Sequence, residues 1–128
     1  MVWNNFGDDE RADPFHEATF ELLNDGPRSP GRSGPGSINF ALDVNARLSA
    51  FGRSRRFEEI EHEQTAWDLV LDPDQAVALY STYSDMTARP ADEQRVVLAE
   101  LRRIAAGPPF NGRVVRNMIT ILWTARRR

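Results

Sequence analysis

The sequence predicts a mixed α/β fold in a single domain. Its 128 residues suit one domain and suffice to bury about two thirds of the unfolded surface. Apolar residues make up 41% and charged residues 27%, close to the average of globular proteins. Stretches with helical periodicity alternate with stretches typical of strands. We therefore expect one domain over residues 1–128, with helices packed beside a small sheet.

The N-terminal part begins with the end of a strand, Met1–Asn4, followed by a helix. Asp13 is the expected N-cap and Pro14 the first helical residue. At that position the missing N–H of proline costs no helical hydrogen bond. One helical face is then apolar: Phe15, Ala18, Thr19, Leu22 and Leu23. Residues 26–37 contain only Gly, Pro, Ser and Arg, so they predict a flexible loop.

A second helix and an edge strand are expected next. Ser37 is the expected cap, Gly52 follows the helix end, and the apolar stripe is Phe40, Val44, Leu48 and Phe51. Residues 57–64 are extended but polar on both faces, which is typical of a strand at a sheet edge.

Two helices and a long strand complete the chain. Asp72 and Gln75 resemble a capping box, and the face that follows is Ala76, Val77, Tyr80 and Tyr83. Another helix begins near Pro90, ends at Gly107 and has the apolar face Val97, Leu101, Ile104 and Ala105. Residues 113–125 then alternate as a strand covered on both sides, with one face formed by Val115, Ile119, Ile121, Trp123 and Ala125.

Composition excludes several classes of function. Without cysteine there are no disulfides, thiolate nucleophiles or cysteine-bound metals. Neither a signal peptide nor an apolar run of about 20 residues is visible, so we expect a cytoplasmic chain without membrane contact. All sixteen basic residues are arginine, and the net charge is −3. Because acids lie beside Arg53, Arg55, Arg56 and Arg126–Arg128, we interpret these arginines as solvated and expect no nucleic-acid binding.

Several segments together resemble the C-terminal half of class I S-adenosylmethionine-dependent methyltransferases. Trp3-Asn4 is similar to the end of the fifth strand in that family, and Ser81-Thr82-Tyr83-Ser84 to the helix after the sixth strand. Residues 92–104 resemble the helix before the last strand, and residues 115–126 the seventh strand itself. The resemblance implies a partial Rossmann-like fold with strands five to seven, in which the antiparallel seventh strand lies between the other two.

The cofactor-binding motifs of the family are missing. The family binds S-adenosylmethionine through an acidic, glycine-rich loop after its first strand, and this chain has no such loop. Gly31, Gly34 and Gly36 follow no strand and are interrupted by Pro35, so they do not predict a phosphate-binding turn. We therefore expect no cofactor binding by this chain alone, and S-adenosylmethionine binding only if an N-terminal half completes the fold. The incomplete sheet predicts a homodimer or an N-terminal partner polypeptide.

Candidate site residues follow partly from the resemblance. His16 begins the helix after the fifth strand, near the acceptor pockets of the family, and is a weak candidate base. Candidate substrate-binding residues are aromatic: Trp3, Phe6, Phe15, Trp67, Tyr80 and Tyr83. A helical tyrosine stripe is more often part of a hydrophobic core. His62 and the carboxylates of Glu59, Glu61 and Glu63 lie on opposite strand faces, so no metal site is expected.

Two functions fit these observations. One is the acceptor-side part of a truncated or split methyltransferase, inactive or weakly active alone. The alternative is a non-catalytic interaction or dimerisation module derived from the same fold. An upstream reading frame encoding an acidic strand end and a Gly-x-Gly loop would favour the first.

Overall fold

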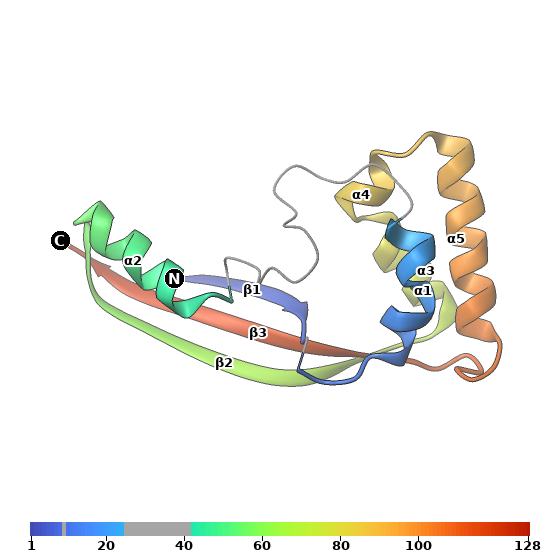
Figure 1. Ribbon diagram of the computed structural model, residues 1–128, viewed down its shortest axis with the longest axis horizontal. Helices are drawn as coiled ribbons and strands as arrows, with labels where there is room; N and C mark the ends of the chain where they lie inside the picture. The colour runs from blue at the N-terminus through green and yellow to red at the C-terminus, as the bar shows by residue number, and fades with distance from the viewer. Residues whose placement is uncertain (9, 25–41) are drawn as a thin grey trace. The chain divides into compact units, whose positions relative to one another are not determined.

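The computed structural model describes residues 1–8, 10–24 and 42–128, and these form five helices and three strands (Figure 1). In chain order the elements are β1 (Val2–Gly7), α1 (Pro14–Asn24), α2 (Val44–Ser54), β2 (Phe57–Leu71), α3 (Pro73–Ser81), α4 (Ser84–Thr87), α5 (Ala91–Ala106) and β3 (Val114–Arg127). The mixed α/β class expected from the sequence is confirmed. Among these described helices, none is long and apolar enough to cross a membrane. The predicted loop at 26–37 lies outside the described residues.

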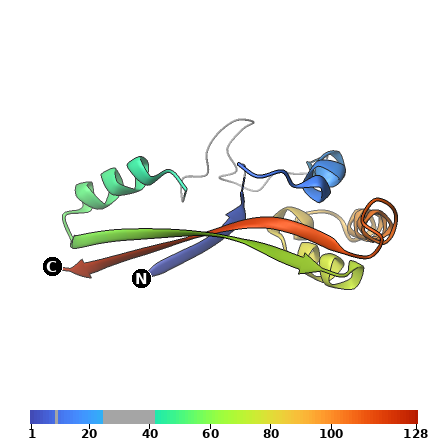
Figure 2. The ribbon, with the colours of Figure 1, turned by 90° about the horizontal axis from the view of Figure 1, so that it is seen from below.

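The three strands form one sheet in the order β1-β3-β2. β1 pairs with β3 antiparallel, in a register that runs from Val2 opposite Trp123 to Gly7 opposite Met118. β2 and β3 also run in opposite directions (Figure 2). The described residues therefore contain no parallel sheet of the Rossmann kind. The first strand does not end at Asn4 as expected, because its pairing with β3 continues to Gly7.

Contacts group the chain into two compact units, and the prediction of one domain over 1–128 stays a prediction. Among the described residues, the sheet unit comprises residues 1–8, 42–67 and 118–128, and the helical unit comprises residues 10–24 and 68–117. β2 and β3 each contribute residues to both units.

In the sheet unit, α2 lies over one face of the sheet (Figure 2). The ring of Phe51 on α2 lies 5.8 Å from that of Trp123, and Ile121 and Trp123 are buried. Asp43 caps α2, and its Oδ1 accepts a hydrogen bond of 2.9 Å from the amide of Ala46. The expected cap Ser37, and Phe40 with it, lie outside the described residues.

The expected end of this second helix at Gly52 is wrong. α2 continues through Gly52 to Ser54, and Arg55 then adopts the left-handed conformation that terminates it. A Cβ on Gly52 would meet no atom within 4 Å, so the glycine occupies an ordinary, open helical position.

β2 confirms the predicted edge strand but is longer than expected. It continues beyond Gln64 to Leu71, and residues 61–66 are all exposed at the edge of the sheet.

β3 is covered on both faces, as predicted, but the burial of single residues differs. Ile121 and Trp123 are buried on the expected face, but Val114 and Arg116 are buried on the other face while Val115 is only half-buried. Asn117 is buried on the same face as Ile121 and Trp123, so both faces of β3 are covered.

The helical unit has a continuous hydrophobic core: Phe15, Leu71, Ala76, Tyr80, Leu101, Ala105 and Val114. The capping box of α3 is confirmed, since Asp72 Oδ1 accepts from the Gln75 amide at 2.8 Å and Gln75 Oε1 accepts from the Asp72 amide at 2.9 Å. The periodicity predicted Tyr80 and Tyr83 on one helix, and this prediction is wrong. α3 ends at Ser81, and Tyr83 occupies the N-cap position of the short α4.

Candidate functional site

A buried ion pair lies within the helical unit. Arg116 Nε on β3 donates to Asp13 Oδ2 at 2.6 Å, and both side chains are about nine-tenths buried. Asp13 Oδ1 accepts a hydrogen bond of 2.8 Å from the amide of His16, which makes Asp13 the N-cap expected for α1. One carboxylate therefore caps a helix and neutralises a buried guanidinium.

The residue next to Arg116 fixes the same segment. Asn117 Nδ2 donates to the carbonyl oxygens of Arg11 and Ala12, each at 2.6 Å. Two consecutive residues of β3 thus hold the entry to α1. A buried amide and a buried guanidinium are both satisfied in this way, as burial of polar groups requires.

Three aromatic side chains contact one another beside the ion pair, and Tyr80 connects them to it. The ring of Tyr80 lies 6.2 Å from that of Phe15 and 5.0 Å from that of Tyr83, measured between centroids. Arg116 Nη1 donates to the Tyr80 hydroxyl, and Arg116 Cζ lies 5.7 Å from the Tyr80 ring centroid. We call Asp13, Phe15, Tyr80, Tyr83 and Arg116 the Arg116 cluster.

Burial sets the protonation of this cluster. It raises the pKa of Tyr80 to about 12, against a smaller lowering by Arg116, and it raises the pKa of Tyr83 as well. For Arg116, burial alone would lower the pKa, but Tyr80 and the Asp13 carboxylate outweigh it and raise that pKa. At neutral pH both phenols are therefore protonated, so they serve as neutral hydroxyls and ring surfaces rather than as bases.

The structure brings together three of the predicted site residues. Phe15 and Tyr80 are core residues, as the alternative interpretation of the tyrosine stripe expected, whereas Tyr83 is 41% exposed. His16 is half-buried, and its ring packs against Phe20 at 5.7 Å.

The other predicted aromatic residues belong to the sheet unit. Trp67 Nε1 donates to Thr120 Oγ1 at 2.8 Å, and that hydroxyl donates to Asn5 Oδ1 at 2.5 Å. Trp3 and Phe6 lie on β1, where they are in register with Leu122 and Ile119 of β3.

Acidic residues of β2 lie beside arginines at the end of β3. The described residues contain no group of three potential ligands that could hold a metal ion. The His62 ring stacks on that of Trp123, with centroids 4.9 Å apart. Arg126 pairs with Glu58 at 2.9 Å and with Glu59 at 2.7 Å, and Arg128 lies 3.6 Å from Glu58, so acids of β2 neutralise these two arginines.

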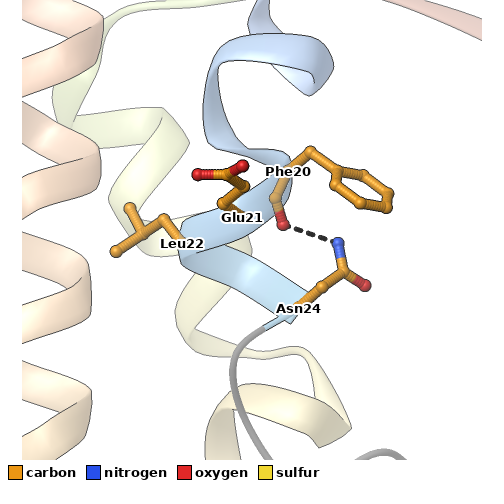
Figure 3. A pocket seen from close by; sticks show the side chains of 4 residues that line it. All are labelled: Phe20, Glu21, Leu22 and Asn24. Carbon is orange, nitrogen blue, oxygen red and sulfur yellow. Dashed lines mark hydrogen bonds between the residues drawn. The ribbon is translucent and has the colours of Figure 1, made fainter.

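An open hollow on the surface lies at the end of α1 (Figure 3). Its walls are Phe20, Glu21, Leu22 and Asn24. Asn24 Nδ2 donates to the carbonyl oxygen of Phe20 at 2.7 Å, which closes the last turn of the helix. No residue of the Arg116 cluster lines this hollow, so it does not extend the candidate site.

Local sequence patterns do not reveal Asp13 and Arg116 as partners in this cluster. Asp13 was assigned only as a helix cap. The position of Arg116 does indicate a buried ion pair, because a charged residue among the apolar residues of a buried strand requires a partner.

A scan against protein-family models found no match, and no curated protein matches the chain.

Proposed function

We propose that this chain is the acceptor-side, C-terminal part of a class I S-adenosylmethionine-dependent methyltransferase. The observation that carries the proposal is the strand order β1-β3-β2, with the last strand in the middle and antiparallel to the first. This is the arrangement implied by the resemblance, with β1 as strand five, β2 as strand six and β3 as strand seven. The partial Rossmann-like fold is part of the same proposal.

The Arg116 cluster supports an acceptor-side role. Methyl transfer is a displacement in which the protein chiefly aligns donor and acceptor. Tyr83 has a partly exposed ring, and its centroid lies 5.0 Å from that of the buried Tyr80 ring. Because both phenols are protonated, they would contact an acceptor as neutral rings, and His16 is the candidate base where an acceptor must lose a proton. The chain would supply these groups, while the cofactor would be held by an N-terminal half.

The alternative function is a non-catalytic interaction or dimerisation module with the same fold. It is favoured by one observation: β1 has a strand partner on one side only among the described residues.

Calorimetry with S-adenosylmethionine tests the proposal. The chain alone should not bind the cofactor with a dissociation constant below about 100 μM, because it lacks the glycine-rich loop. Co-purified with the polypeptide of an upstream reading frame that encodes such a loop, it should bind more tightly than this limit. The upstream polypeptide alone is the control.

Three results would contradict the proposal. Tight binding by the chain alone would show that the cofactor site is not in a separate half. A stable complex that binds no cofactor, or the lack of such an upstream frame, would favour the interaction module.

A further inference from the structure

The two outer edges of the sheet differ in how they resist pairing with another strand. β3 lies in the middle of the described sheet, so β1 and β2 each have an outer edge. A free edge presents unpaired N–H and C=O groups, and proteins usually protect it with charges or an irregular backbone.

The outer edge of β2 carries both kinds of protection. Glu61 and Glu63 are exposed and place two carboxylates near it, whereas Glu58 and Glu59 pair with Arg126 at the end of β3. Glu59 also has a positive φ of 51°, which interrupts the regular extended backbone near the start of the strand. A strand that paired here would have to approach charged residues on a bent template.

β1 carries neither kind of protection. Val2–Gly7 contain no charged residue and no proline, and no non-glycine residue with positive φ occurs among them. In an antiparallel pair, alternate residues direct their backbone groups toward the partner and the others direct theirs away. Half of the backbone groups of β1 therefore point away from β3, and Val2 is 52% exposed.

We propose that in the purified chain this edge of β1 pairs antiparallel with β1 of a second copy. A second copy suits the edge because β1 is uncharged, so the pairing brings no charge to the new interface. A twofold axis makes the pairing reciprocal and closed, giving one six-stranded sheet of the order β2-β3-β1-β1-β3-β2. This inference does not depend on the methyltransferase proposal, and an N-terminal half that used the same edge would compete with it.

Symmetry also limits the register. A twofold axis perpendicular to a sheet places one residue opposite its own copy. Centred on Asn4, the pairing joins Val2 of each copy to Phe6 of the other, and Gly7, a poor strand residue, faces only Met1 beyond the strand. A charged residue introduced at position 4 would therefore face the same charge on the other copy, which destabilises a strand pair.

Sedimentation equilibrium at micromolar concentration tests the pairing. The unmodified chain should form a dimer, and Asn4→Arg and Asn4→Asp should each weaken dimerisation by about tenfold or more. An equimolar mixture of these two variants should restore association, because opposite charges then face each other. Thr65→Arg, at an exposed position of β2, is the matched control and should leave the dimer unchanged.

Hydrogen exchange on the unmodified chain provides a measurement that does not depend on the folding of a variant. Protection of the β1 amides should rise with protein concentration, while that of residues 61–66 should not. A 14.5 kDa species at every concentration would overturn the proposal. So would equal weakening by Thr65→Arg, a mixture of charge variants that fails to associate, or β1 protection that is independent of concentration.

Discussion

Arg116 determines the chemistry of the helical unit at the scale of single residues. A guanidinium cannot be left uncompensated in a core, and here a carboxylate, a phenol and an aromatic face all approach it. The sequence showed a charged residue in an apolar strand but not its partner, because Asp13 lies 103 residues away. Local patterns identify a cap at Asp13, and only the folded chain shows that the same carboxylate binds Arg116.

Tyr80 should titrate at unusually high pH. Its folded pKa of about 12 exceeds the ordinary 10.0, so the folded state holds the proton more tightly than the unfolded state does. The resulting stability of about 2 to 3 kcal/mol is present below pH 10.0 and is lost as the pH rises toward 12. The sequence has two tyrosines, so Tyr83→Phe leaves Tyr80 as the single phenol for an absorbance titration. A midpoint near 10 in this folded variant would contradict the burial of Tyr80.

Breaking the buried ion pair should destabilise the protein strongly. Arg116→Met leaves the Asp13 carboxylate buried without its cation, which costs about 3–5 kcal/mol. Arg102→Met is the matched control, because Arg102 pairs with Asp74 at the surface, where both side chains are more than half exposed. That substitution should cost about 0–1 kcal/mol. Urea unfolding measures both values, and equal costs would show that the Arg116–Asp13 pair contributes no more than a surface contact.

At the scale of elements, the sequence predicted helices better than strands. The start of α3 is fixed by Asp72, Pro73 and Gln75, which act within four residues and are visible in the sequence. The extent of β1 depends on pairing with β3, more than a hundred residues away, and was therefore underestimated. The predicted end of β2 at Gln64 is too early, because the exposed middle of the strand, residues 61–66, shows no alternation of apolar residues.

The candidate site shows the same division between local and distant information. Phe15 and Tyr80 could each be predicted on the apolar face of a helix, since helical periodicity is visible from residues close in the chain. Their contact with each other, and the position of Tyr83 at the start of a separate short helix, depend on how the helices pack. Trp67 was grouped with the tyrosines by its position in the sequence, but it belongs to the sheet unit.

At the scale of the whole chain, each compact unit has buried residues of its own. Leu101 is fully buried in the helical unit and Ile121 in the sheet unit. A protein with separate cores tends to open in separate cooperative segments, each protected by its own packing. The alternation of helices and strands predicted the α/β class, but it gave no indication of this division, because β2 and β3 contribute residues to both units.

Two core substitutions should therefore affect different parts of the chain. Leu101→Ala and Ile121→Ala each remove a fully buried aliphatic side chain, at a cost of about 2–5 kcal/mol. Leu101→Ala should accelerate amide hydrogen exchange in α1, α3 and α5, where the Leu101 core lies. Ile121→Ala should accelerate it in α2, in β1 and in the parts of β2 and β3 within the sheet unit. Each variant is the control for the other. If either one raised exchange equally throughout the chain, the two units would open as one, and the separation of their cores would have no consequence for stability.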